Sequence, residues 1–164
     1  MKVSGLDLSI TATGVTHTVE GRPCWHLIRT KEKGDLRLTE LQRRIRDFVL
    51  DSDLVLIEGY LNKSMSAGIT GMVHGAVRSM LIEEGLRYAT LPPSSLKKYA
   101  TGRGNATKTD MAVAALKRGN VEFRDDNECD SWWLWLAARD HSDRPYIPMP
   151  SVNRESLNKI TMEA

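Results

Sequence analysis

Hydrophobic and polar positions in the first third of the chain predict a meander of strands, then a helix and a buried strand. Alternation of the two kinds of residue favours strands over 2–8, 15–19 and 25–30, with short polar turns between them. Hydrophobic residues then recur at helical spacing over 36–50. The continuously apolar run 54–57 is typical of a central strand that is buried on both faces.

The rest of the pattern is mainly helical. One further strand is predicted over 88–91, where two prolines stop it. The predicted helices span residues 67–84, 94–99, 108–117 and 126–141, the third of them with Thr107 as its N-cap. This order of elements predicts an α/β fold with a mixed central sheet, an antiparallel meander followed by parallel strands, and helices on both faces.

Length and proline content suggest the domain organisation. A chain of 164 residues has the size of one domain. We assign residues 1–142 to that domain and residues 143–164, which hold three prolines, to a C-terminal surface segment. In the last helix, Trp132 and Trp135 share a face that packs on the sheet, whereas Trp133 is expected to be partly exposed.

The net charge at first says little about partners. Lys and Arg number 23 against 21 Asp and Glu, so the net charge of +2 excludes a histone-like basic protein and an acidic tail protein. The balance hides a separation: residues 87–118 hold seven basic residues and one acidic residue, whereas residues 119–143 hold seven acidic and two basic ones. The sequence therefore places a phosphate-facing segment next to an acidic one.

Two features concern location. The longest apolar run, 132–138, is far shorter than the roughly 20 residues that cross a bilayer, so no membrane partner is expected. The first residues hold no apolar segment typical of a signal peptide, and two cysteines are too few for a disulfide framework. We expect a cytoplasmic protein, in the host cytoplasm if a phage encodes it.

Three acidic residues lie where apolar elements do not usually carry them. Asp7 ends the first predicted strand, Glu58 ends the buried strand, and Asp130 lies inside the last helix. Their charges would repel one another unless a cation neutralised them, and oxygen ligands select Mg²⁺ or Mn²⁺. Two such ions, about 4 Å apart, would stabilise the attacking and leaving oxygens of a phosphodiester displacement.

Asp126 and Asn127 extend this cluster as candidate metal ligands, because they precede Asp130 by one helical turn. A second interpretation of Asp126 stays open, in which it is the N-cap of the helix. The four histidines of the chain show no metal-ligand spacing in the sequence.

These residues stand in motifs that resemble those of the RuvC family of Holliday junction resolvases, notably its short phage members. The similarity covers residues 2–140 and rests on the ordered motifs Gly5-Leu6-Asp7-Leu8-Ser9, Leu56-Ile57-Glu58, Leu91-Pro92-Pro93-Ser94-Ser95-Leu96-Lys97-Lys98, Thr101-Gly102-Arg103-Gly104-Asn105-Ala106-Thr107-Lys108 and Asp126-Asn127-Glu128-Cys129-Asp130-Ser131. The resemblance implies a ribonuclease H-like fold, a homodimer, Mg²⁺ dependence and paired nicks across a four-way DNA junction.

The resemblance also implies a set of metal ligands. Three metal-binding carboxylates of the family are matched by Asp7, Glu58 and Asp130. Asn127 stands at the fourth ligand position, where many members carry Asp and some carry His. Because asparagine is neutral, Asp126 and Glu128 are alternatives for the fourth ligand.

Basic and aromatic positions match DNA-contacting residues of the family. Lys97 or Lys98, together with Lys108, match lysines near the scissile phosphate. A lysine that ends a glycine-rich loop, as Lys108 does, can reach a phosphate while loop amides bind its oxygens, and Arg103 lies in the same loop. Tyr60 is a candidate for stacking on an unpaired base, although it is offset by one position from the aromatic residue of the family.

The hypothesis from the sequence is a Mg²⁺-dependent crossover junction endonuclease with two ions per active site. Its catalytic residues would be Asp7, Glu58, Asp130 and Lys108. The dimer interface would lie on the helix over 67–84, where Gly71 and Gly75 share a face that allows close packing.

Three alternatives remain. A ribonuclease H-like nuclease could act on flaps, replication forks or RNA in place of junctions. A protein with the neutral Asn127 could also bind junctions without cutting them. An actin-like nucleotide-binding domain opens with a sequence similar to Asp7-Leu8-Ser9, but that architecture normally needs two such domains, which the length disfavours.

Overall fold

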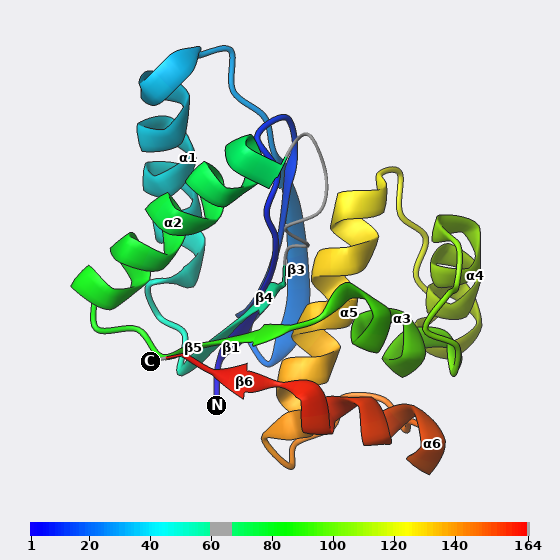
Figure 1. Cartoon of the computed structure of the whole chain (residues 1–164). Coiled ribbons are helices and arrows are strands. Elements are labelled where there is room, and N and C mark those ends of the chain that lie inside the picture. Colours follow the sequence, from blue (N-terminus) through cyan, green and yellow to red (C-terminus); the bar gives the residue numbers. More distant parts are fainter. Residues whose placement is uncertain (60–66, 164) are drawn as a thin grey trace.

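A mixed sheet of six strands forms the centre of the computed structural model, which describes residues 1–59 and 67–163 (Figure 1). The strands lie side by side in the order β3-β2-β1-β4-β5-β6. Their bounds are Val3–Asp7 (β1), Thr13–Val19 (β2), Arg22–Ile28 (β3), Leu54–Glu58 (β4), Tyr88–Leu91 (β5) and Thr161–Met162 (β6). Strands β1, β2 and β3 pair antiparallel, β4 and β5 continue parallel to β1, and β6 returns antiparallel.

Helices cover both faces of the sheet (Figure 1). On one face, α1 (Gly34–Val49) and α2 (Ala67–Glu83) enclose a core around Leu6, Val15 and Ile57. The other face carries α5 (Asp126–His141), with three further helices beyond it: α3 (Pro93–Thr101), α4 (Lys108–Gly119) and α6 (Ser151–Arg154). None of the helices in the described part of the chain is both long and apolar enough to cross a bilayer.

The elements expected from the pattern are confirmed, with ends that shift by at most three residues. The antiparallel meander followed by parallel strands confirms the mixed α/β class. Thr107 is the N-cap of α4 as predicted: its hydroxyl accepts a hydrogen bond from Asp110 N (3.1 Å), and the Asp110 carboxylate accepts one from Thr107 N (2.8 Å).

Residues 143–163 differ from the surface segment that the sequence predicts. After α6, a 3₁₀ turn (Glu155–Lys159) leads into β6, which extends the sheet beyond β5. Buried Asn153 donates a hydrogen bond to a backbone carbonyl of α3 (2.7 Å), and Arg154 Nη2 lies 2.8 Å from Oδ1 of the buried Asp140 on α5. These contacts join residues far apart in the sequence, so the local pattern does not reveal them.

Helix α5 packs on β1 and β2 with its backbone directly against theirs. A Cβ atom at Gly5 would overlap the carbonyl oxygen of Ser131 and lie 2.5 Å from Trp135 N. A Cβ atom at Gly14 would overlap the carbonyl oxygen of Asn127. Because only glycine lacks a Cβ, these two positions fix how closely the helix approaches the sheet.

The second half of α5 is the most enclosed part of the fold. Every residue from 131 to 138 is buried, which includes Trp132, Trp133 and Trp135. The expectation that Trp133 is partly exposed is wrong, because α4 covers that side and Trp133 Nε1 donates a hydrogen bond to Met111 O (3.3 Å). A helix enclosed on all sides has no polar face to shift into solvent, so its position is well defined.

We expect Gly5→Ala to lower the free energy of unfolding by about 3 kcal/mol, because the added methyl group must push α5 away from the sheet. Urea unfolding followed by tryptophan fluorescence measures this change. Gly68→Ala on α2 is the matched control, since no atom lies within 4 Å of a Cβ built there and alanine is the better helix former. Equal stability of the Gly5→Ala and parent proteins would contradict the close approach of α5.

Candidate active site

Parallel pairing of β1 and β4 brings two acidic residues together at one edge of the sheet. Leu6 lies opposite Ile57 in the register, so Asp7 and Glu58, the next residue on each strand, lie side by side at the carboxyl ends of the strands. Asp7 also pairs with Gly14 on β2, the residue against which α5 is seated. Helix α5 therefore passes over the carboxyl end of β1, where Asp7 lies.

Asp130 completes the cluster from α5. Asp130 precedes Ser131, whose carbonyl oxygen lies against Gly5. The charge of Asp130 raises the pKa of Asp7, so the two carboxyl groups are close in space. Glu58 is likewise influenced by the charges of Asp7 and Asp130. The structure thus brings together the three carboxylates that the sequence singles out, from two strands and one helix.

Burial makes ionisation of these carboxyl groups costly. Asp7 is 9% exposed, and burial, followed by the Asp130 charge, raises its pKa to about 7. For Glu58, burial and then the Asp7 charge raise the pKa to about 9. Burial also raises the pKa of Asp130, to about 6. Within the described part of the chain, no hydrogen bond or ion pair compensates these three carboxylates.

The donor set fits a hard divalent cation. Three carboxylates, without thiol or imidazole, are the chemistry that Mg²⁺ and Mn²⁺ prefer. The oxygens of Asp7, Glu58 and Asp130 do not all lie within 4.8 Å of one another, so the three groups converge on the region without closing on one point. Buried carboxylates that lack partners gain most from a cation, because it removes both their mutual repulsion and the cost of their burial.

Two lysines border the cluster. Lys108 is the first residue of α4, and its Nζ lies 2.8 Å from Asp126 Oδ2. Its charge acts to lower the pKa of all three carboxyl groups, and that of Lys97 acts in the same direction on Glu58 and Asp130. Of the two lysines that the sequence leaves as alternatives, Lys97 is therefore the one beside the carboxylates.

Other predicted DNA-contacting residues lie farther out. Lys98 Nζ is 3.3 Å from Glu155 Oε2, in the C-terminal segment, and Arg103 Nη2 is 3.4 Å from Asp110 Oδ2. Neither of these two side chains is among the charges that shift the pKa of the carboxyl cluster. Tyr60, the candidate for base stacking, lies outside the described residues.

The start of α5 is organised by a residue that the sequence analysis missed. Asp125, not Asp126, is the N-cap: its Oδ1 accepts hydrogen bonds from Asn127 N (2.9 Å) and Asn127 Nδ2 (2.7 Å). The N-cap interpretation of Asp126 is thus wrong. The signal was present, since Asp125 precedes two further polar residues at the predicted start of the helix, but three consecutive polar residues hide which one is the cap.

The three candidates for a fourth ligand differ in position. The Asn127 side-chain amide is engaged by Asp125, whereas Asp126 raises the pKa of Asp7 and of Asp130 through its charge. Glu128 instead acts on the pKa of His26, on β3. Asp126 therefore lies closer to the carboxylates in electrostatic terms than Glu128 does.

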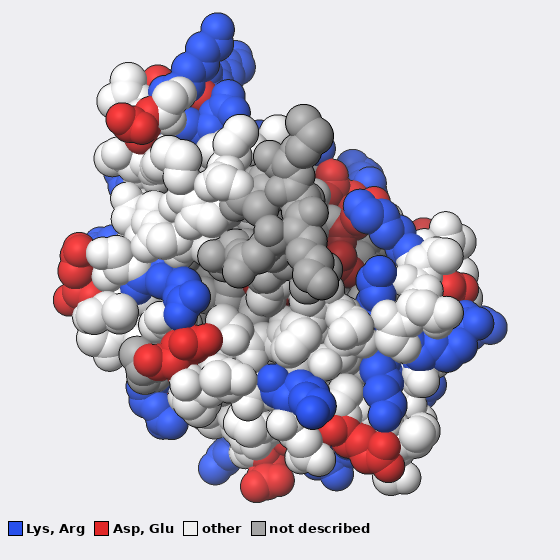
Figure 2. Space-filling model, viewed as in Figure 1, with Lys and Arg blue, Asp and Glu red and all other residues white. Residues whose placement is uncertain are grey.

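Surface charge agrees with the separation seen along the sequence. Figure 2 shows Lys and Arg side chains gathered over α3 and α4, next to Asp and Glu side chains near the start of α5. A polyanion could bind the basic side chains while its backbone approaches the acidic cluster, provided that cations screen the carboxylates.

Known proteins share this sequence and fold. No protein-family model matches the chain. It is 30% identical over 129 residues to a crossover junction endodeoxyribonuclease RuvC from Salinispora arenicola, a match that covers 71% of this chain and 74% of the relative. Similarity over so much of both sequences establishes common family membership.

Solved structures agree on the fold. Thermus thermophilus RuvC matches with a TM-score of 0.72 and 20% identity, over 92% of this chain and 100% of the other. T. thermophilus RuvC in complex with a Holliday junction substrate matches with a TM-score of 0.74 and 19% identity, over 99% of each chain. These matches confirm the expected ribonuclease H-like fold.

The raised pKa values predict how stability depends on pH. A carboxyl group whose pKa is higher in the folded state than in the unfolded state binds more protons when folded, so stability falls as pH rises through the folded pKa. In EDTA, we expect the free energy of unfolding to decrease by several kcal/mol between about pH 5 and pH 9. Urea unfolding at a series of pH values measures the slope, and added Mg²⁺ should reduce it.

Two variants test the origin of that slope. Asp7→Asn removes a carboxyl group of the cluster and should flatten the dependence, whereas Asp35→Asn, at an exposed position on α1, should leave it unchanged. The same slope in Asp7→Asn as in the parent would show that other groups cause it.

Proposed function

The chain belongs to the RuvC family of crossover junction endodeoxyribonucleases, and from this we propose that it is a structure-selective endonuclease that resolves Holliday junctions and related branched DNA. The observation that carries the proposal is the cluster of one buried and two half-buried carboxylates, with raised pKa values that the two lysines at its border offset only in part. A buried acidic cluster costs stability unless a ligand uses it. Phosphodiester hydrolysis assisted by metal ions is a reaction that such a cluster serves.

Asp7, Glu58 and Asp130 would hold Mg²⁺, or Mn²⁺, with two ions in each active site. Asp126 is our preferred fourth ligand, and Asn127 is the alternative through its side-chain oxygen. When bound, the ions supply an activated water as nucleophile and stabilise the leaving 3′ oxygen of the cut strand. The residues of the chain contribute fixed positions, because Asp7 and Glu58 end adjacent strands and Asp130 projects from the enclosed helix α5.

Lys108 and Lys97 would bind the phosphate that is cut. Lys108 has an exposed side chain and pairs with the half-exposed Asp126, so a phosphate can take the place of that carboxylate at little cost. Release of Asp126 from Lys108 would at the same time free its carboxylate for a cation. Lys98 and Arg103 would contact the DNA backbone farther from the cut.

We also propose that two copies of the chain form the working unit. Along α2, exposed apolar side chains and an open glycine follow one stripe: Ile69 (53% exposed), Met72 (52%), Gly75 and Ile82 (58%). A cavity of about 230 Å³ between α1 and α2 adjoins this stripe and is lined by Ile10, Leu38, Ile69 and Met72. Apolar side chains exposed at helical spacing favour a second copy as partner, which would present a second active site to the opposite strand of a junction.

The proposed setting is the cytoplasm, where DNA is accessible to the enzyme. The described cysteines, Cys24 and Cys129, are both free thiols, as in a reducing compartment.

Substitution of the carboxylates should separate DNA binding from cleavage. We expect Asp7→Asn and Glu58→Gln to bind a four-way junction as the parent does but to cut it about 1000-fold more slowly or worse, because each loses a metal ligand. Gel-shift and single-turnover nicking assays measure the two properties. Asp35→Asn, an exposed acid on α1, is the control and should cut normally. Retained nicking by either cluster variant would refute the mechanism.

The choice of substrate decides between the proposal and its alternatives. The parent protein should make paired nicks in a mobile junction with Mg²⁺ and leave plain duplex intact. Faster cleavage of a flap, a fork or an RNA–DNA hybrid would support the alternative nuclease. Junction binding without any cut in Mg²⁺ or Mn²⁺ would indicate a catalytically inactive binding protein.

A charged residue on the α2 stripe should prevent dimerisation. We expect Met72→Glu to convert the protein to a monomer, because a carboxylate at the centre of an apolar interface loses its hydration without gaining a partner. Light scattering coupled to gel filtration measures the mass. Val152→Glu, at an equally exposed apolar position on α6, is the control and should remain dimeric. A Met72→Glu protein of dimer mass would place the interface elsewhere.

A further inference from the structure

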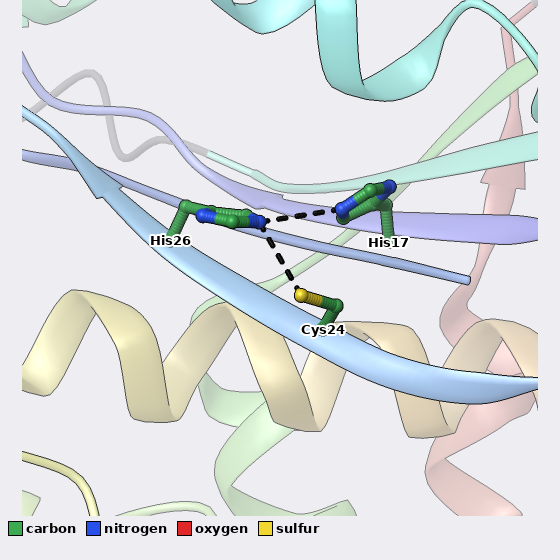
Figure 3. A group of neighbouring side chains, drawn as sticks. All are labelled: His17, Cys24 and His26. Carbon is green, nitrogen blue, oxygen red and sulfur yellow. Dashed lines mark hydrogen bonds between the residues drawn. The ribbon is translucent and has the colours of Figure 1, made fainter. Parts of the chain in front are cut away.

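Three side chains of the kinds that ligate zinc lie together on the face of the sheet opposite to α5. His17 on β2 pairs with Cys24 on β3 in the antiparallel register, and His26, two residues after Cys24, points to the same side of the strand. Phe48 of α1 contacts both imidazole rings, which places the three side chains between the sheet and α1. Figure 3 shows that they point toward one another.

The spacing of the three ligand atoms suits one small metal ion. His17 Nε2 lies 3.3 Å from His26 Nε2, and Cys24 Sγ lies 3.4 Å from His26 Nε2. One ligand atom from each residue lies within 4.8 Å of the other two. In a tetrahedral site with Zn–N near 2.0 Å and Zn–S near 2.3 Å, adjacent ligand atoms are roughly 3.3–3.6 Å apart.

Hydrogen bonding alone does not account for this arrangement. Both close contacts converge on His26 Nε2, and an imidazole nitrogen carries either one proton or one lone pair. It therefore cannot form two well-aligned hydrogen bonds at once. A cation at the centre would instead accept a lone pair from each of the three groups.

The surroundings also suit a borderline metal ion. All three side chains are half-buried, His26 stacks on Phe48 with ring centroids 4.3 Å apart, and His17 meets the edge of the same ring. The half-buried position of the two imidazoles disfavours their charged form, and the neutral imidazole is the form that binds metals. A cavity of about 370 Å³, lined by His17 and Phe48, adjoins the group on the side of His17.

We propose that His17, Cys24 and His26 form a zinc site that fastens the edge strand β3 to β2, on the face of the sheet that α1 covers. A ligand set of two imidazoles and one thiolate selects zinc over Mg²⁺. The site lies on the other face of the sheet from the carboxylate cluster, so it adds stability to the hairpin and takes no part in DNA hydrolysis.

Cobalt spectroscopy and zinc titration test the site directly. The 164-residue protein is titrated with Co²⁺ in excess Mg²⁺, which is added to compete for the carboxylates of the proposed active site. We expect one equivalent of Co²⁺ to produce a thiolate-to-cobalt charge-transfer band and the visible bands of tetrahedral cobalt. Zn²⁺ should displace the cobalt and raise the melting temperature.

Three variants assign the bands to these residues. Cys24→Ser should abolish the charge-transfer band, and His26→Gln should weaken zinc binding by more than about 100-fold, since even residues that only support a ligand cost up to that much. His141→Gln, an exposed histidine at the end of α5, is the control and should bind like the parent. Circular dichroism of each variant verifies that it is folded.

Two results would overturn the proposal. The first is the absence of a charge-transfer band from the folded parent protein. The second is zinc binding that Cys24→Ser and His26→Gln leave unchanged, which would place the ion elsewhere, at the carboxylates. If Cys24→Ser fails to fold, the parent spectrum and His26→Gln still decide the matter.

Discussion

The backbone contact between α5 and the first two strands is the constraint on which the rest of the structure depends. Gly5 and Gly14 let the helix approach until its carbonyl groups touch the strands. That distance sets where Asp130 stands relative to Asp7, and on the side of α5 away from the sheet Trp132 and Trp133 pack against α4. The geometry of the carboxylate cluster and the packing of the core therefore both depend on this contact. A shift of α5 relative to the sheet would disturb both.

The same arrangement makes the carboxylate cluster a region that lowers the stability of the fold. Burial raises the pKa of Asp7, Glu58 and Asp130, and the two bordering lysines offset only part of this effect. Elsewhere the protein pairs its buried charge: Asp140 has both the Tyr99 hydroxyl (3.1 Å) and Arg154 beside it. The contrast marks the carboxylate cluster as the place where stability is given up for ligand binding.

Sequence reasoning predicted the elements and singled out the three clustered carboxylates because each rests on local information. Alternation and helical spacing locate β1, β4 and α5, and an acid at the end of a buried strand stands out. Contacts between segments that are distant in the sequence could not be predicted in this way. Two examples are the ion pair of Lys98 with Glu155 and the pairing of β6 with β5. The His17–Cys24 pairing was hidden for the same reason, because it exists only in the register of the hairpin.

The pairing of β6 with β5 has a consequence for how the protein avoids self-association. Without β6, the edge of β5 would present unpaired amide and carbonyl groups, which template the addition of foreign strands. β6 pairs with β5 through Thr161 and Met162, and Glu163 fixes its end through Arg78 (3.0 Å) and the Thr90 hydroxyl (3.1 Å). A short strand held by charged side chains is a poor template, so in the folded protein β6 shields this edge of the sheet from the addition of foreign strands.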